Sequence, residues 1–178
     1  MQTMMYRLYL KIPGPEDKVQ VMSYRQAHYD SGETVINGCG GLDKVDAYEA
    51  WLARLQCNSC DETVLPGLVP ASTFLAVLAE DGRVVGMIDI RHRLNEYLRK
   101  LGGHVGYGLH PDERGKGYGT EMLALGLEEC RKLGLEKVLL TCNKDNIASA
   151  SVMLKNGAVL ENEVPDGEKT IQRYWIAL

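Results

Sequence analysis

Leu109-His-Pro-Asp-Glu-Arg-Gly-Lys-Gly-Tyr-Gly-Thr-Glu-Met122 is a glycine-rich segment that joins two patterns of different periodicity. The apolar run 105–109 before it predicts a strand, and the apolar spacing from Met122 to Gly134 after it predicts a helix. Glycines permit a positive φ and close backbone approach. The first turn of a helix adds unpaired N–H groups and the positive end of a dipole. The segment therefore predicts an anion-binding loop that suits a phosphate or pyrophosphate.

The glycine spacing separates the known kinds of phosphate loop. No Gly-Lys-Ser/Thr occurs in the chain, and no start position completes the dinucleotide pattern Gly-x-Gly-x-x-Gly. Arg114, Gly117 and Gly119 do complete Arg-x-x-Gly-x-Gly. This pattern resembles the acyl-CoA pyrophosphate loop of the GNAT N-acetyltransferase superfamily. The resemblance implies that acetyl-CoA contacts Arg114, Gly115, Lys116, Gly117, Tyr118, Gly119 and Thr120.

A second segment is similar to the same superfamily. Residues 137–142 predict a buried strand, and a loop and helix follow, with Asp145 or Asn146 as N-cap and Gly157 just past the helix end. In the superfamily this helix lies along the CoA pantetheine arm, which implies contacts from Asn143, Asn146 and Ser149. The superfamily often has a tyrosine four residues before the glycine, as an acid for the leaving thiolate. Met153 takes that place here.

The order of predicted elements is β-α-α-β-β-β-α-β-α-β-β. It indicates an α/β fold with a mixed sheet and helices on both faces. The resemblance, which covers about residues 72–178, implies a mostly antiparallel GNAT-like sheet with splayed central strands. The first helix, 16–29, has Val19 and Met22 on one side and Tyr24 and His28 on another. We expect a second helix over 43–55 with Asp43 as N-cap, and strands over 6–10, 74–79, 83–93, 105–109, 137–142 and 169–178.

Length and composition indicate one domain over residues 1–178. The resemblance implies that residues 72–178 form the acetyl-CoA core and residues 1–70 the acceptor side. A net charge of −4 disfavours a nucleic-acid surface. No apolar run approaches about 18 residues and no leader pattern is present, so we expect no membrane span and a cytoplasmic location. Cys57 and Cys60 have no second ligand pair, so we interpret them as ordinary thiols and expect no metal.

Three residues are candidates for the base that deprotonates the acceptor. His104 lies at the start of the predicted central strand, where related enzymes often carry an acidic or histidine base, and its ordinary pKa suits the task. Asp89 shares a strand face with Arg91, either in solvent or in a polar cleft, and Glu33 lies in a glycine-rich loop. The resemblance also implies that backbone N–H groups of the splayed strand hold the thioester carbonyl; these belong to Tyr107, Gly108 and Leu109.

The predicted reaction is transfer of acetyl from acetyl-CoA to a primary amine, by direct attack of a small amine or a peptide. Two alternatives stay open. Met153 is compatible with a CoA-binding regulatory domain without activity, and the acceptor or donor can instead be an alcohol or a longer acyl group. The strand 169–177 suggests a possible homodimer through strand pairing.

Overall fold

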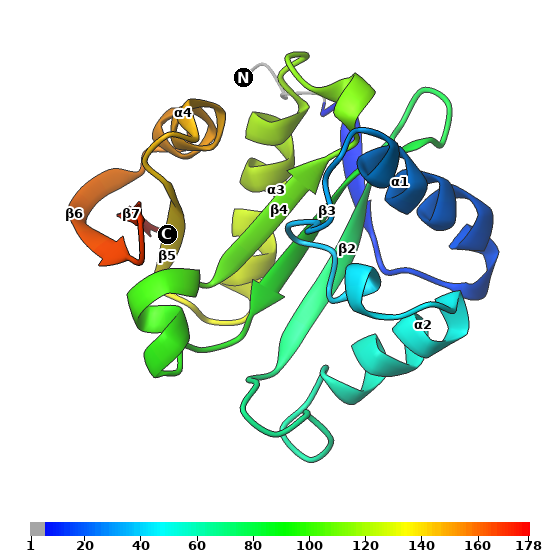
Figure 1. The fold of residues 1–178 in the computed structure, drawn as a ribbon, viewed down its shortest axis with the longest axis horizontal. Helices are drawn as coiled ribbons and strands as arrows, with labels where there is room; N and C mark the ends of the chain where they lie inside the picture. Colours follow the sequence, from blue (N-terminus) through cyan, green and yellow to red (C-terminus); the bar gives the residue numbers. More distant parts are fainter. Residues whose placement is uncertain (1–5) are drawn as a thin grey trace.

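Residues 6–178 are described by a computed structural model, in which the strands form two antiparallel sheets (Figure 1). The first sheet has the order β1-β2-β3-β4 and the second the order β5-β7-β6. The strand bounds are β1 Leu8–Lys11, β2 Ala71–Leu78, β3 Val84–Arg91, β4 Val105–Leu109, β5 Lys137–Asn143, β6 Val159–Asp166 and β7 Lys169–Ala177.

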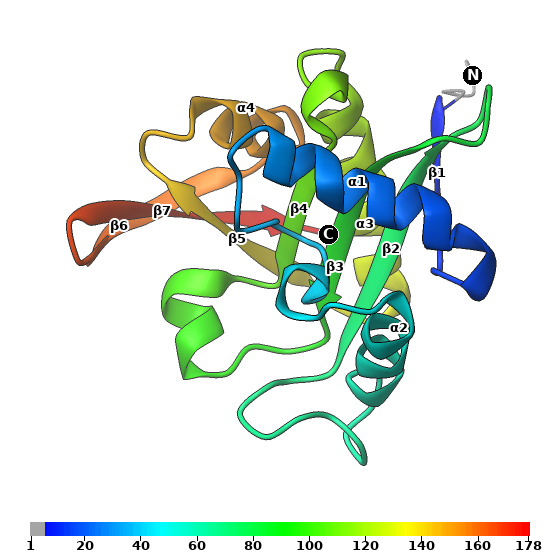
Figure 2. The same cartoon turned by 45° about the vertical axis from the view of Figure 1, so that its right-hand side comes forward.

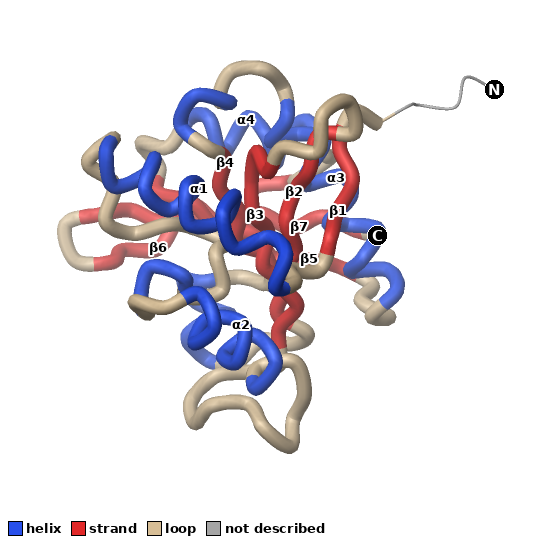
Figure 3. The backbone as a smooth tube through the Cα atoms, turned by 90° about the vertical axis from the view of Figure 1, so that its right-hand side faces the viewer, coloured by secondary structure: helices blue, strands red, loops and turns tan. Residues whose placement is uncertain are grey.

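Helices cover both faces of the first sheet. Helices α1 (Lys18–Asp30) and α2 (Tyr48–Cys57) lie on one face, and α3 (Tyr118–Lys132) lies on the other (Figures 2 and 3). Helix α4 (Ile147–Lys155) packs against β5 and α3, and a short π-helix at Leu98–Gly102 precedes β4. The predicted α/β fold and its element order are confirmed.

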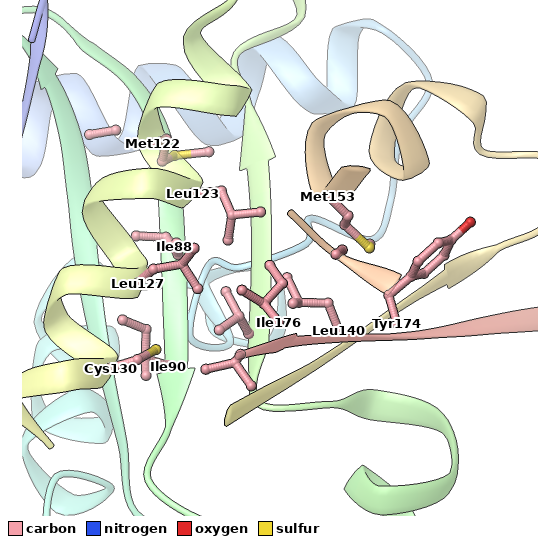
Figure 4. Packing of buried hydrophobic residues seen from close by; sticks show 14 of the residues in the cluster. Ile88, Ile90, Met122, Leu123, Leu127, Cys130, Leu140, Met153, Tyr174 and Ile176 are labelled. Atoms are coloured by element: carbon pink, nitrogen blue, oxygen red, sulfur yellow. The ribbon is translucent and has the colours of Figure 1, made fainter. Parts of the chain in front are cut away.

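Alternation along the strands separates two hydrophobic cores. Ile88 and Ile90 of β3 point toward α3, where they meet Met122, Leu123 and Leu127 (Figure 4). Met87, between the two isoleucines, points to the opposite face and packs with residues of α1 and α2. Successive side chains of a strand alternate between faces, and most residues of this strand are apolar because both of its faces are covered. The β3–β4 pair between these cores carries the glycine-rich segment at its end.

The two sheets part between β4 and β5. His104, just before β4, donates its backbone N–H to the carbonyl of Leu139 at 2.7 Å, while its own carbonyl accepts from Arg91 of β3. At the other end of β4, His110 N–H donates to the carbonyl of Val85. In an antiparallel ladder every second residue turns both backbone groups toward its partner. Residues 106 and 108 therefore face β3, and the backbone groups of Tyr107 and Leu109 face the open edge toward β5.

Two local expectations differ from the structure. Residues Leu42–Lys44 form a 3-10 turn and α2 begins only at Tyr48, because the Asp43 carboxylate accepts from the N–H of Ile36 and the thiol of Cys39 instead of capping a helix. Strand β7 pairs with β5 on one side and β6 on the other. It is the middle strand of its sheet, so the expected strand pairing through β7 is wrong, while the homodimer itself stays a prediction.

Candidate active site

The glycine-rich loop follows β4 directly. Gly115 has φ 76° and Gly117 has φ 86°, values that side chains other than glycine rarely adopt. Gly117 is the N-cap of α3 and offers no side-chain bond to the first turn. The first N–H groups of α3 and the positive end of its dipole therefore face outward at a loop with open space around Gly115. This geometry fits a pyrophosphate held by backbone groups.

Both cations of the loop are paired with carboxylates. Arg114 donates two hydrogen bonds to Glu33, at 2.6 and 2.8 Å, and Lys116 donates to Glu113 at 2.8 Å. The groups of this loop that remain unpaired toward a phosphate are therefore mainly backbone N–H groups, and the phosphate contacts themselves stay a prediction.

Arg7, ahead of β1, is a loop neighbour that sequence reasoning missed. It donates to the carbonyl of Lys116 at 3.1 Å, forms an ion pair with Glu121 at 3.1 Å, and lies over the ring of Tyr118. Its guanidinium lies 3.3 Å from the position that a Cβ on Gly117 would take. More than a hundred residues separate Arg7 from the loop in sequence, so only the charge of Arg7 could have suggested that it lies beside an anion-binding loop.

Tyr107 and Ser149 are brought together across the gap between the sheets. The Tyr107 hydroxyl lies 3.0 Å from the Ser149 hydroxyl and donates to the Ser149 carbonyl at 3.2 Å. Burial raises the pKa of Tyr107 to about 12, so the phenol stays protonated. Both residues thus border the space between β4 and α4, where the predicted pantetheine contacts lie.

Asn143 and Asn146 lie together at the end of β5. The Asn146 side chain accepts from the N–H of Ser149 at 3.1 Å and caps α4, as predicted. Both asparagines line a pocket of about 560 Å³, whose other lining residues are Lys144, Asp145, Glu168, Lys169 and Thr170. This polar pocket lies beside the N-terminus of α4.

His104 has the surroundings of a structural histidine. It is 5 % exposed, its Nδ1 accepts from the N–H of Leu139 at 2.9 Å, and its ring lies against Trp175. Burial lowers the pKa of His104 to about 4, with a further contribution from nearby arginines. A ring whose basic nitrogen already accepts a buried backbone N–H does not fit the predicted role of general base.

The carboxylate of Asp89 is likewise buried and bonded to neighbouring side chains. It is 8 % exposed, accepts from the Thr73 hydroxyl at 2.8 Å and pairs with Arg91 at 3.0 Å. The structure therefore places Asp89 in a buried polar cluster between β2 and β3. Of the two placements that the sequence left open, solvent is ruled out, because Asp89 is buried and is held by the Thr73 hydroxyl and the Arg91 guanidinium.

Glu33 is the anionic centre of a network on the acceptor side. It accepts both bonds from Arg114, and its second oxygen lies 2.6 Å from Nδ1 of His28. The bonds from Arg114 lower the pKa of Glu33 to about 2, so this carboxylate is a weak base. Glu33 is thus well placed near β4 but not suited to accept the proton itself.

The remaining predicted positions lie outside this network. Met153 is buried in the core near Tyr174 (Figure 4), and Cys57 and Cys60 are exposed at the end of α2 and in the following loop. Within residues 6–178 no cluster of three or more His, Cys, Asp or Glu is arranged for a metal ion. No helix in that range is both long and apolar enough to span a bilayer.

Solved structures share this architecture. A ribosomal-protein-S5-alanine acetyltransferase from Vibrio fischeri matches with TM-score 0.69 and 17 % identity, over 98 % of this chain and 95 % of its own. An acetyltransferase from Salmonella typhimurium that modifies the N-terminal serine of ribosomal protein L7/L12 matches with TM-score 0.66 and 17 % identity, over 97 % and 95 %. The microcin C7 self-immunity acetyltransferase MccE, solved with acetyl-CoA and AMP, matches with TM-score 0.68 and 14 % identity, over 97 % and 93 %.

Sequence comparisons point the same way. Curated protein sequences gave no significant match. A family model described as an acetyltransferase (GNAT) domain matches residues 7–159, which is most of the chain and includes the glycine loop and α4. With the loop geometry, the parted strands and this match together, the chain belongs to the GNAT acetyltransferase family.

Proposed function

We propose that the protein transfers an acetyl group from acetyl-CoA to a primary amine. The observation that carries this proposal is the open edge of β4 that leads into a glycine loop at the start of α3. With the pyrophosphate of acetyl-CoA on the loop backbone, the pantetheine arm can extend along this edge of β4. The edge is accessible because no strand of the described structure pairs with it. The family assignment and the structure of MccE with acetyl-CoA support the donor.

The open edge also supplies the groups that act on the thioester. The backbone groups of Tyr107 and Leu109 face the edge, so a Tyr107 or Leu109 N–H can hold the thioester carbonyl and the oxyanion that forms on attack. Gly108 turns its backbone toward Met87 of β3, so we assign it a packing role instead. The neutral amine attacks the carbonyl carbon, and the C–S bond breaks to release the CoA thiolate.

The acceptor approaches from the face covered by α1 and α2. Segment 31–47 crosses this face in front of β3 and β4 (Figure 2), and Gly38 packs directly on the backbone of Tyr107. The similar structures named above act on the N-terminal serine of one ribosomal protein and the alanine of another, and a further one is a spermidine N-acetyltransferase chimera. We therefore propose a peptide N-terminus or a polyamine as the acceptor class.

The experiment is a thiol-release assay with acetyl-CoA and a panel of acceptors. The panel contains a serine-initiated peptide, an alanine-initiated peptide and spermidine. The controls are two N-blocked peptides without a free amine, one of which carries a serine side-chain hydroxyl. We expect thiol release only with free amines, and a product heavier by one acetyl group. A donor series with longer acyl groups tests the alternative donor. Thiol release with none of these acceptors, in a protein that still binds CoA, would support a binding domain without activity instead.

A further inference from the structure

Two buried polar atoms on α1 have no hydrogen-bond partner among residues 6–178. They are the hydroxyl of Tyr24 and Nε2 of His28, in side chains that are 1 % and 2 % exposed. The residues are four apart, so they lie on one face of the helix, and their rings meet edge to face at 4.6 Å. A buried polar atom without a partner costs stability, so its retention calls for a reason.

The contact with Glu33 determines which nitrogen of His28 carries the proton. Nδ1 lies 2.6 Å from a carboxylate oxygen of Glu33. The carboxylate is ionised and can only accept, so Nδ1 must donate. In the neutral ring Nε2 then carries the lone pair. Burial lowers the pKa of His28, which favours the neutral ring near pH 7.

The Glu33–His28 pair lies next to the open edge of β4. Arg114 donates to Glu33 and also to the carbonyl of Leu109 at 3.3 Å, so one guanidinium joins the pair to the edge strand. The Tyr24 hydroxyl lies 3.5 Å from the position that a Cβ on Gly108 would take. The unpartnered atoms therefore belong to the acceptor face of the strand that carries the proposed thioester contacts.

We propose that His28 is the general base of the reaction, oriented by Glu33, and that Tyr24 hydrogen-bonds the acceptor nitrogen. This assignment rests on the proposed function. As the C–N bond forms and the C–S bond breaks, Nε2 takes one proton from the amine nitrogen, directly or through one water. Glu33 stabilises the imidazolium, and the proton then passes to the CoA thiolate to give the free thiol. Glu33 and Arg114 act as positioning residues.

The charged and titratable groups around the His28 ring are compatible with a neutral ring that donates from Nδ1. The groups that face His28 are Glu33 from the loop after α1, Tyr24 from α1 itself, and Arg114 and His110 from the segment after β4. Arg114 keeps Glu33 ionised, so the carboxylate holds the ring without removing its proton. A carboxylate that fixes the tautomer of a histidine is a recurrent device for presenting a basic nitrogen.

The first test needs no acceptor. Long-range 1H–15N spectra of protein labelled with 15N-histidine report which ring nitrogen is protonated, and His28→Gln assigns the signals. We expect the Nδ1–H tautomer of His28 in the wild-type protein. In Glu33→Gln we expect that the ring no longer favours this tautomer. A neutral Nε2–H tautomer in the wild-type protein would overturn the proposal, because the nitrogen assigned as base would already carry a proton.

The second test measures kcat/KM with whichever amine of the panel is acetylated. His28→Ala and His28→Gln are each expected to lower kcat/KM by about 10²-fold or more, while the Kd of acetyl-CoA stays within about twofold. Added imidazole is expected to restore part of the rate in His28→Ala. The matched control is His92→Gln, because His92 is a half-buried histidine at the other end of the sheet, whose ring Nε2 lies 2.8 Å from the Ser72 hydroxyl. It should keep wild-type kcat/KM.

The pH profile completes the test. Protonation of the acceptor amine gives kcat/KM an acidic limb in every variant. Protonation of His28 should add a second, steeper fall below pH 6.5 in the wild-type protein, and this second fall should disappear in both His28 variants. Folded His28 variants with wild-type rates and an unchanged second fall would refute the base role and leave the proposed function intact. A wild-type protein that acetylates no amine would instead refute the proposed function, and the base role with it.

Discussion

Gly38→Ala tests the packing of segment 31–47 on the sheet. Gly38 has φ 71°, and a Cβ there would lie 2.5 Å from Tyr107 Cα, 2.7 Å from the Gly106 carbonyl oxygen and 2.8 Å from that of Met87. All three are backbone atoms of the β3–β4 pair. They cannot move aside as a flexible side chain can, so the segment itself must lift away from the strand.

The expected cost has two parts that a matched variant separates. An alanine in the left-handed region costs about 1–2 kcal/mol, and overpacking adds about 1–3 kcal/mol. Gly32→Ala, in the same segment at φ 81° with open space around it, carries only the first part. We therefore expect Gly38→Ala to be less stable than Gly32→Ala by about 2 kcal/mol, or roughly 4–8 °C in Tm for a chain of this size.

Thermal and urea unfolding of both variants measure this difference. The Gly38→Ala protein should also lose acetyl transfer, because the segment carries Glu33 and lies over the backbone of Tyr107. Equal Tm values for the two variants would refute the reasoning, since they would show that the segment does not press on the strand.

Three further predictions concern the cofactor loop and His104. Gly117→Val should weaken acetyl-CoA binding at least about tenfold by calorimetry, whereas Gly134→Val, at a similar φ of 78° in open space, should not; equal affinities would mean that the loop is wrongly assigned. CoA at about 100 times its Kd should stabilise the protein by roughly 2.7 kcal/mol, and a larger thermal shift with NADH would contradict the assignment. Because burial lowers the pKa of His104 from 6.5 to about 4, wild-type stability should fall as the pH drops from about 6.5 toward 4. His104→Ala should flatten that dependence and cost about 1–3 kcal/mol by leaving the N–H of Leu139 unpaired. An unchanged stability profile would contradict the structural role of His104, and a change in the pH dependence of kcat/KM would return it to the role of base.

Local patterns determined much of the fold. The apolar run 105–109 is β4, and the glycines at 115 and 117 adopt the positive φ that the loop requires. Asn146 caps α4, and Gly157 follows its end with φ 83°. These features depend on neighbours within a few residues, so periodicity and capping chemistry predict them. The family pattern added the parting of the strands, which composition alone does not indicate.

The side of a helix that meets the core was not decided by local pattern. The first helix offered two candidate faces, and the structure buries the face with Tyr24 and His28 while Val19 stays 80 % exposed. In α2, Trp51 is fully buried against the same face of the sheet. The sheet chooses the buried face by its position, and that position depends on chain segments far away in sequence.

The catalytic candidates show the same division. Sequence reasoning favoured His104 as the base, for its position and residue type, and kept Asp89 and Glu33 as further candidates because each is able to take a proton. Tertiary contacts separate them: a backbone N–H occupies Nδ1 of His104, Thr73 and Arg91 hold Asp89, and Arg114, 81 residues away, holds Glu33. The basicity of a side chain depends on burial and on partners in space. The sequence by itself determined the glycine-rich loop and the family, and only the tertiary structure decided which histidine presents a nitrogen without a partner among residues 6–178.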